Sequence, residues 1–279
     1  MLNTKTTLCE TNNSIVIGTY KQVTKVFKHP ELELDHQSEC DMTRSILQHM
    51  GLPTRTSVQL FRNQEGIWTM QQPRFTCDVR TFYYKQSREL GWSSSLIIPL
   101  LKDVYNALRH LRTRFGCVHG DVKPANIMVY FRGPVPRFVL WDYGAAVSPT
   151  NAQYDLGPNE LMTLWYRAPE RRVPYIYNQS KIDVWSMGVM TVELLGGLRL
   201  FQGQTTSHQF QICDSVRHLK TATGDGQVST LTDSTGLVYP RMYIPLVKPT
   251  LVVNPSERPD IDGMLLVLHY LETTAPLST

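Results

Sequence analysis

The stretch VHGDVKPANIMV, residues 118–129, decides how this chain is organised. It places Asp121, Lys123 and Asn126 on a short loop between an apolar helix pattern (94–115) and an apolar strand pattern (127–130). In an in-line phosphoryl transfer, a carboxylate accepts the hydroxyl proton, an ammonium steadies the phosphoryl oxygens and an amide oxygen holds a metal ion. The residue types and their offsets therefore predict a loop that is built for this chemistry.

The composition sets broad limits on what the chain can be. Its 279 residues are enough for one large domain or two lobes, and 42% of them are hydrophobic. The net charge of +4 is dispersed, which does not indicate direct nucleic-acid binding. No apolar run approaches the roughly 20 residues of a membrane span, and the N-terminus lacks the apolar core of a signal peptide. Five scattered cysteines without C-x-x-C spacing predict reduced thiols. We expect an intracellular protein, cytoplasmic or nuclear, without a membrane partner.

Three further segments follow the loop in order. They are Asp142-Tyr143-Gly144, TLWYRAPE at 163–170 and DVWSMG at 183–188. Together with the loop they resemble the eukaryotic-type Ser/Thr protein kinases, in which Asp-Phe-Gly and a similar Ala-Pro-Glu segment stand in these places. The resemblance covers roughly residues 10–270 and implies an α+β, bilobal protein kinase fold. The expected domain spans 1–279, with a small β-rich N-lobe (1–72) and a larger helical C-lobe (73–279).

The resemblance assigns chemical roles in the C-lobe. It implies that Asp121 is the catalytic base, that Lys123 stabilises the transferring phosphoryl group, and that Asn126 and Asp142 hold Mg²⁺ between them. Thr163 is expected to bond the catalytic Asp and Lys, which in the family goes with Ser/Thr specificity.

Other residues are expected to support the loop. Asp183 would cap the backbone of the catalytic loop, and Glu170 would form a buried pair with Arg258. Gly120 stands where most kinases have an arginine that reads a phosphate on the activation segment. Its presence therefore predicts activity that does not need phosphorylation of that segment.

The N-lobe offers a lysine for the nucleotide phosphates. The motif Val26-Phe27-Lys28 predicts Lys28 for this role, with Val26 roofing the adenine, while Lys25 is a competing choice on the opposite face of the strand. The helix expected over 37–50 would supply the glutamate that pairs with the lysine. Glu39 is predicted, and Glu33 and Asp41 are alternatives.

The loop over the phosphates departs from the family pattern. Counting back from Val16, which is assigned to the ATP site, the three glycine positions hold Cys9, Thr11 and Ser14. Because only glycine lets backbone N–H groups approach a phosphate closely, this loop would cover the phosphates less tightly.

The adenine end of the site is expected where the lobes join. Met70 is predicted as the gatekeeper residue, and Gln71-Gln72-Pro73 as the hinge that meets the adenine edge. Proline has no N–H, so Pro73 would remove one of the usual adenine hydrogen bonds.

These observations predict a Ser/Thr protein kinase that uses ATP and Mg²⁺ on a protein substrate, and they do not identify a regulatory partner. One alternative is a pseudokinase scaffold, which the missing glycines and Pro73 favour. Another is a small-molecule kinase, because aminoglycoside and choline kinases share His-Gly-Asp, although they lack a segment like 163–170. The compact N-lobe and the loop resemble the divergent kinases of large DNA viruses, which would place the protein in a host cell.

Overall fold

The structure is a computed structural model. It describes residues 6–11, 13–19, 22–52, 58–89, 94–131, 133–148, 164–172, 181–196, 200–201, 203, 221–224, 227–232, 238–239 and 243–274.

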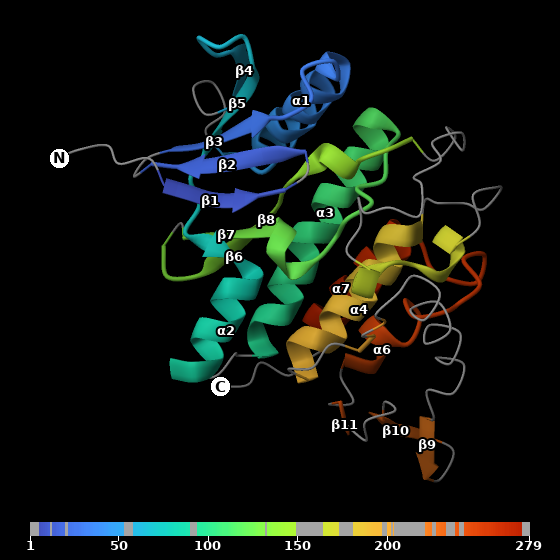
Figure 1. The fold of residues 1–279 in the computed structure, drawn as a ribbon. Helices are drawn as coiled ribbons and strands as arrows, with labels where there is room; N and C mark the ends of the chain where they lie inside the picture. The colour runs from blue at the N-terminus through green and yellow to red at the C-terminus, as the bar shows by residue number, and fades with distance from the viewer. Residues whose placement is uncertain are drawn as a thin grey trace.

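An antiparallel sheet of five strands forms the N-terminal part of the molecule (Figure 1). Its order is β1-β2-β3-β5-β4, so β1, β2 and β3 follow one another as antiparallel neighbours, and the β4–β5 hairpin then adds to the sheet with β5 beside β3. The strands are β1 (Thr6–Glu10), β2 (Ser14–Gly18), β3 (Gln22–Phe27), β4 (Gln59–Arg62) and β5 (Trp68–Pro73). β-branched and aromatic residues, which favour a pleated and half-buried surface, dominate β2 and β3.

Helix α1 (Glu33–His49) packs against one face of this sheet. Its buried side chains include Cys40 and Leu47, which lie in one core cluster with Phe27 and Met70 of the sheet. The predicted helix over 37–50 is therefore present, and it begins earlier, at Glu33. Its end coincides with the left-handed backbone of Gly51, at φ 69°.

Helices make up most of the C-terminal part (Figure 1). The α-helices are α2 (Val79–Glu89), α3 (Ile97–Phe115), α4 (Ile182–Gly196), α6 (Ile244–Val247) and α7 (Ile261–Thr274). Short 3₁₀ helices are η1 (Ser94–Leu96), η2 (Pro124–Asn126), η3 (Tyr143–Ala145), η4 (Leu164–Tyr166) and η5 (Pro169–Arg172). Two small antiparallel sheets have the strand orders β6-β7-β8 and β11-β10-β9 among the described residues. Their strands are β6 (Cys77–Asp78), β7 (Ile127–Phe131), β8 (Pro136–Leu140), β9 (Thr221–Gly224), β10 (Gln227–Thr232) and β11 (Val238–Tyr239). This arrangement is the α+β architecture, a β-rich part followed by a larger helical part, that the sequence predicts.

Helix α3 is the central support of the helical part. The spacing of its apolar residues predicts one buried stripe, and Leu100, Val104, Leu108 and Leu111 are each at most 1% exposed. Removing such a side chain from water contributes about 1.5–3 kcal/mol. The helix stops at Gly116, which is left-handed at φ 65° and donates its N–H to a carbonyl of the last turn. The chain then turns directly into residues 118–129.

Two sequence expectations concern the chain as a whole. Among the described residues, no helix combines the length and apolarity that crossing a bilayer requires. The cysteines in the described part, Cys9, Cys40, Cys77 and Cys117, are free thiols. The fifth, Cys213, lies outside the described residues.

Candidate active site

The loop after α3 is held in shape by a buried carboxylate from α4. The Asp183 side chain accepts the backbone N–H of His119 at 2.8 Å and that of Gly120 at 2.9 Å. Burial raises the pKa of this carboxyl, and His119 and the two N–H donors counteract that rise. Asp183 therefore makes the capping contacts with the loop backbone that the sequence predicts.

Gly120 has the backbone that this shape requires. Its φ is +82°, and a Cβ added there would lie 2.8 Å from the carbonyl oxygen of Ala145. Any side chain would meet both the strained backbone and this close contact, which accounts for glycine at the position.

The loop brings its three polar side chains together. Lys123 Nζ lies 2.6 Å from Asp121 Oδ2, and Asn126 Nδ2 donates to the same carboxylate oxygen at 2.9 Å. Asn126 also donates to the backbone oxygen of Asp121 at 2.9 Å. Asp121 is only 7% exposed. A carboxylate fixed from two sides beside an ammonium is an arrangement that can orient a hydroxyl and receive its proton.

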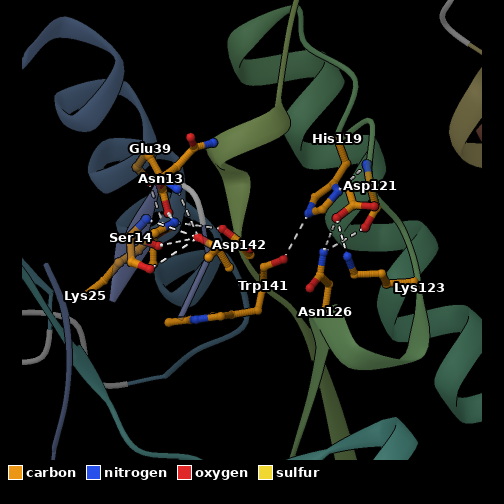
Figure 2. A network of polar contacts seen from close by, with 12 residues as sticks. Asn13, Ser14, Lys25, Glu39, His119, Asp121, Lys123, Asn126, Trp141 and Asp142 are labelled. Atoms are coloured by element: carbon orange, nitrogen blue, oxygen red, sulfur yellow. Dashed lines mark hydrogen bonds and ion pairs between the residues drawn. The ribbon is translucent and has the colours of Figure 1, made fainter. Parts of the chain in front are cut away.

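A second cluster forms under the five-stranded sheet (Figure 2). Lys25 Nζ lies 2.7 Å from Glu39 Oε1 of α1 and 2.9 Å from Asp142 Oδ1. The choice of Glu39 over Glu33 and Asp41 as the partner of the strand lysine is thus confirmed. Gly144 permits the close approach, because a Cβ there would lie 3.2 Å from Glu39 Oε2.

The prediction that Lys28 meets Glu39 is wrong. Lys28 Nζ instead reaches Glu10 Oε1 at 2.8 Å and the carbonyl oxygen of Thr11 at 2.7 Å. The reason is the alternation of side chains along extended backbone. Lys28 comes three residues after Lys25, directly after β3, so the two side chains point to opposite sides of the sheet. Lys25, the competing choice, has the position that the sequence analysis gave to Lys28.

The same alternation sorts the other residues that were assigned to the nucleotide. Val16 and Met70 are the register partners of Lys25 in β2 and β5, so they share its face of the sheet. Val26 and Gln71 lie one residue out of phase with Lys25 and Met70, so their side chains belong to the opposite face of the sheet.

The residues predicted as the hinge form the end of a strand. β5 continues through Pro73, which pairs with Gln22 of β3, so Gln71 to Pro73 still belong to the sheet. The segment that leaves the sheet is 74–76, and Thr76 N–H bonds to the carbonyl of Val129 in β7 at 3.0 Å. Met70 is 1% exposed and packs in the core beneath the sheet.

The charges of the second cluster support one another. Burial by itself would lower the pKa of the Lys25 ammonium, but Glu39 and Asp142 outweigh it and raise the pKa. Lys25 in turn holds the pKa of Asp142 below its usual value. Burial raises the pKa of Glu39, and Lys25 opposes that rise. Lys25 is therefore a firmly charged ammonium between two carboxyl groups.

Backbone contacts join the two clusters (Figure 2). His119 accepts the N–H of Asp121 at Nδ1, 3.2 Å away, so Nε2 carries the proton and donates to the carbonyl of Trp141 at 3.0 Å. Trp141 N–H donates to the carbonyl of Asn126 at 2.8 Å. Tyr143 is buried and donates its hydroxyl to the carbonyl of Leu140 at 2.8 Å. The residues around Asp142 are thus tied to the loop that carries Asp121.

Asn126 and Asp142 fit a magnesium site in their chemistry. The side chain of Asp142 is 48% exposed, and Lys25 bonds only one of its oxygens among the contacts described. Asn126 uses its amide nitrogen toward Asp121, which leaves the amide oxygen facing the other way. Mg²⁺ commonly takes one or two protein oxygens and fills its shell with phosphate and water. The described residues contain no cluster of three His, Cys, Asp or Glu, so this mixed pair is the candidate.

A buried ion pair supports the site from behind. Arg258 forms two bonds with Glu170, at 2.6 and 3.0 Å, and the two side chains are 0% and 3% exposed. Arg258 also donates to the carbonyls of Val252 and Lys181. The predicted pairing of Glu170 with Arg258 is confirmed. Thr163, predicted to bond Asp121 and Lys123, lies outside the described residues.

Comparison with known proteins agrees with this geometry. The family description "Protein kinase domain" matches residues 7–268, nearly the whole chain. The chain belongs to the protein kinase domain family. Its fold is accordingly the protein kinase fold.

Several protein kinases of known name are similar to this kinase domain. The serine/threonine-protein kinase US3 homolog of equine herpesvirus 1 (strain Ab4p) is 35% identical over 210 residues, 74% of this chain and 46% of that protein. A probable serine/threonine-protein kinase of Dictyostelium discoideum is 28% identical over 186 residues, 64% of this chain and 34% of that protein. The CTD kinase subunit alpha of Schizosaccharomyces pombe is 31% identical over 124 residues, 44% of this chain and 20% of that protein. The kinase domain described here spans less than half the length of these relatives.

Sequence reasoning ranked Lys25 below Lys28. No motif separates the two lysines, because the choice depends on which face of the sheet α1 covers.

Proposed function

We propose that this chain transfers the γ-phosphoryl group of ATP to serine or threonine hydroxyls of protein substrates. The observation that carries the proposal is the joining of two clusters, Lys25–Glu39–Asp142 and Lys123–Asp121–Asn126, through the contacts of Trp141. A fold used only as a scaffold has no need of these six polar side chains in two connected clusters. The names of the relatives, which are serine/threonine-protein kinases, support the choice of acceptor.

In this proposal each residue has one task. Lys25 binds the non-transferred phosphates, with Glu39 orienting it, and Asn126 and Asp142 hold Mg²⁺. When bound, Mg²⁺ supplies charge neutralisation at the phosphate oxygens. Asp121 accepts the hydroxyl proton of the substrate.

Lys123 stabilises the negative charge on the phosphoryl group during its transfer. It lies 2.6 Å from Asp121, so the ammonium is already positioned before substrate arrives. Most of the catalysis would therefore be positioning and preorganised electrostatics.

Regulation follows from Gly120. With Gly120 at this place, the loop lacks the arginine that in most kinases reads a phosphate on the activation segment. Activity of the recombinant protein should therefore survive prior treatment with phosphatase, and loss of activity after that treatment would contradict the idea.

The test of the proposed function is transfer of radiolabelled phosphate from ATP to a generic protein substrate. The wild type is compared with Asp121→Asn, which keeps the size of the side chain and removes the proton acceptor. We expect transfer by the wild type and a loss of at least about 100-fold in the variant. Equal transfer by both proteins, or none by either, would remove the proposal.

A pseudokinase scaffold is the second candidate, and one observation favours it. The residues in the glycine positions of the phosphate loop, Cys9, Thr11 and Ser14, carry side chains, and Thr11 is fixed by a bond from Lys28. Binding of ATP without any transfer would support this reading.

The place of action is part of the proposal. Similarity to a kinase of equine herpesvirus 1 supports a viral origin. The cytoplasm or nucleus of a host cell is then where the protein would act.

A further inference from the structure

His36 is a buried polar side chain that the chemistry described so far does not use. It lies in the first turn of α1 and is 6% exposed. Its ring stacks on Phe27, the last residue of β3, with ring centroids 3.8 Å apart and an interplanar angle of 15°. One side chain of α1 is therefore in direct contact with the end of the strand that carries Lys25.

A hydrogen bond fixes the edge of the same ring. Nε2 of His36 lies 2.8 Å from the carbonyl oxygen of His29, in the segment that follows β3. A carbonyl oxygen only accepts, so Nε2 carries the proton and donates it. The same carbonyl accepts the N–H of Leu32 at 3.2 Å, and the N–H of His36 donates to the carbonyl of Leu32 at 3.1 Å. His36 thus closes the turn through which β3 leads into α1.

The N-terminal end of α1 lacks the usual anchor. A helix commonly begins at Ser, Thr, Asp or Asn, whose side chain accepts a free N–H of the first turn. Leu32 stands at the N-cap position of α1, and its apolar side chain cannot accept such a bond. The contacts of His36 with Phe27 and with the carbonyl of His29 therefore anchor the beginning of the helix against the sheet.

The anchor lies one helical turn before Glu39. Side chains three residues apart stand on the same face of a helix, with Cβ atoms about 5–6 Å apart. Both side chains are buried, since His36 is 6% and Glu39 is 5% exposed. On the strand, Lys25 Nζ lies 5.4 Å from the centroid of the Phe27 ring and 2.7 Å from Glu39 Oε1. The stacked pair and the ion pair are thus adjacent links between the same strand and the same helix.

We propose that His36 positions Glu39 against Lys25, and that it serves phosphoryl transfer through this pair. A displaced beginning of α1 would carry Glu39 with it, because intrahelical hydrogen bonds tie the two residues to one backbone. Of the two carboxylate partners described for Lys25, Asp142 alone would then remain, 2.9 Å away. The inference rests on the proposed function, since it takes Lys25 to bind the phosphates.

The experiment is a double-mutant cycle in the transfer of labelled phosphate by the full chain. His36→Leu removes both the flat ring and the donor, whereas His36→Phe keeps a ring that can stack on Phe27 and removes only the donor. The control is His49→Leu, the same substitution on the same helix. The ring of His49 also stacks, on His110 of α3, with centroids 4.3 Å apart. Each substitution is made in the wild type and in Glu39→Gln.

We expect His36→Leu to lower kcat of the wild type by about 10- to 100-fold, because misplacing a catalytic group by about 1 Å can cost about 100-fold. His36→Phe should fall between this variant and the wild type, since it keeps one of the two contacts. His49→Leu should stay within about twofold of the wild type, as is usual for an exposed position. In Glu39→Gln, where the charge to be positioned is already gone, His36→Leu should lower kcat by at most about twofold.

A loss by the same factor in the wild type and in Glu39→Gln would overturn the inference, because a residue that only stabilises the fold acts independently of Glu39. Unchanged kcat in His36→Leu would also overturn it. So would an equal loss in His49→Leu, which would mean that any lost packing on α1 has this effect. Urea unfolding shows whether each variant is folded, and His36→Phe carries the same comparisons if His36→Leu is not.

A second measurement does not depend on turnover. Urea unfolding of Lys25→Met, Glu39→Gln and the double variant gives the coupling between Lys25 and Glu39. It is measured in the wild type and in the His36→Leu background. Most of the coupling should be lost in that background, and unchanged coupling would overturn the inference. A wild type that transfers no phosphate but shows this loss would refute the proposed function, and the placement of Glu39 by His36 would stand.

Discussion

Replacing Lys25 by methionine and, separately, Lys28 by methionine decides which lysine serves the nucleotide. Methionine keeps the length and apolar stem of the side chain and removes only the charge. Lys25 is 12% exposed in its side chain and meets two carboxylates at 2.7 and 2.9 Å. Lys28 is 32% exposed and pairs with Glu10, which is 60% exposed.

The magnitudes follow from this difference. Losing one preorganised charge that faces the reacting group costs about 2.7–4 kcal/mol, so Lys25→Met should lower kcat/KM by about 10²–10³-fold. Removing one partner of a buried pair also leaves Glu39 without its counter-charge, at a cost of about 3–5 kcal/mol in unfolding free energy. An exposed pair contributes about 0–1 kcal/mol, so Lys28→Met should stay within about fivefold of the wild type.

The assay is steady-state transfer of labelled phosphate, with urea unfolding of the same preparations. Lys25→Met with Glu39→Gln is the control for stability, because it removes the uncompensated carboxylate and should restore part of the unfolding free energy without restoring activity. A loss of 100-fold or more in Lys28→Met, with Lys25→Met near the wild type, would refute the reasoning.

Three other predictions concern stability. Glu170→Ala should lower the unfolding free energy by about 3–5 kcal/mol in urea, because the guanidinium of Arg258 is 0% exposed and would be left buried alone; a change below 1 kcal/mol would contradict this. Gly120→Ala should cost about 1–3 kcal/mol, because φ is +82° and the new Cβ would lie 2.8 Å from a carbonyl oxygen, and an unchanged Tm would count against it. The neighbouring ammonium lowers the pKa of Asp142 from its usual 3.8, so this carboxylate stabilises the fold above about pH 4 and stops doing so as the pH falls through the lowered pKa. We therefore compare the unfolding free energies of the wild type and Asp142→Asn. The difference should be less than about 1 kcal/mol at pH 7, because the carboxylate is half exposed, and it should shrink toward pH 2. A difference that grows in acid would refute this prediction.

Much of the C-terminal half could be predicted because its signals are local. Asp121, Lys123 and Asn126 lie on one loop, and their offsets alone bring them together. Asp183 and Arg258 lie far in sequence from the residues they contact. Their roles were predicted from the family resemblance of the motifs that contain them, because periodicity does not indicate such distant contacts.

The N-terminal half was harder for a physical reason. In a strand, two lysines an odd number of residues apart point to opposite faces, and composition does not say which face a helix will cover. Only the packing of α1 shows that Lys25, and not Lys28, lies on the covered side. Gln71-Gln72-Pro73 was predicted as the hinge, yet β5 runs through Pro73.

The capping of the loop by Asp183 has a consequence for the order in which the protein matures. A chain made from its N-terminus exposes residues 118–129 to folding well before α4 (Ile182–Gly196) has been synthesised. Until then the N–H groups of His119 and Gly120 have no carboxylate to hold them, and Glu170 still waits for Arg258. A growing chain should therefore carry all the residues of the loop while it is still without the shape that phosphoryl transfer requires. Competence would therefore come late, once both Asp183 and Arg258 have been synthesised and have reached their partners.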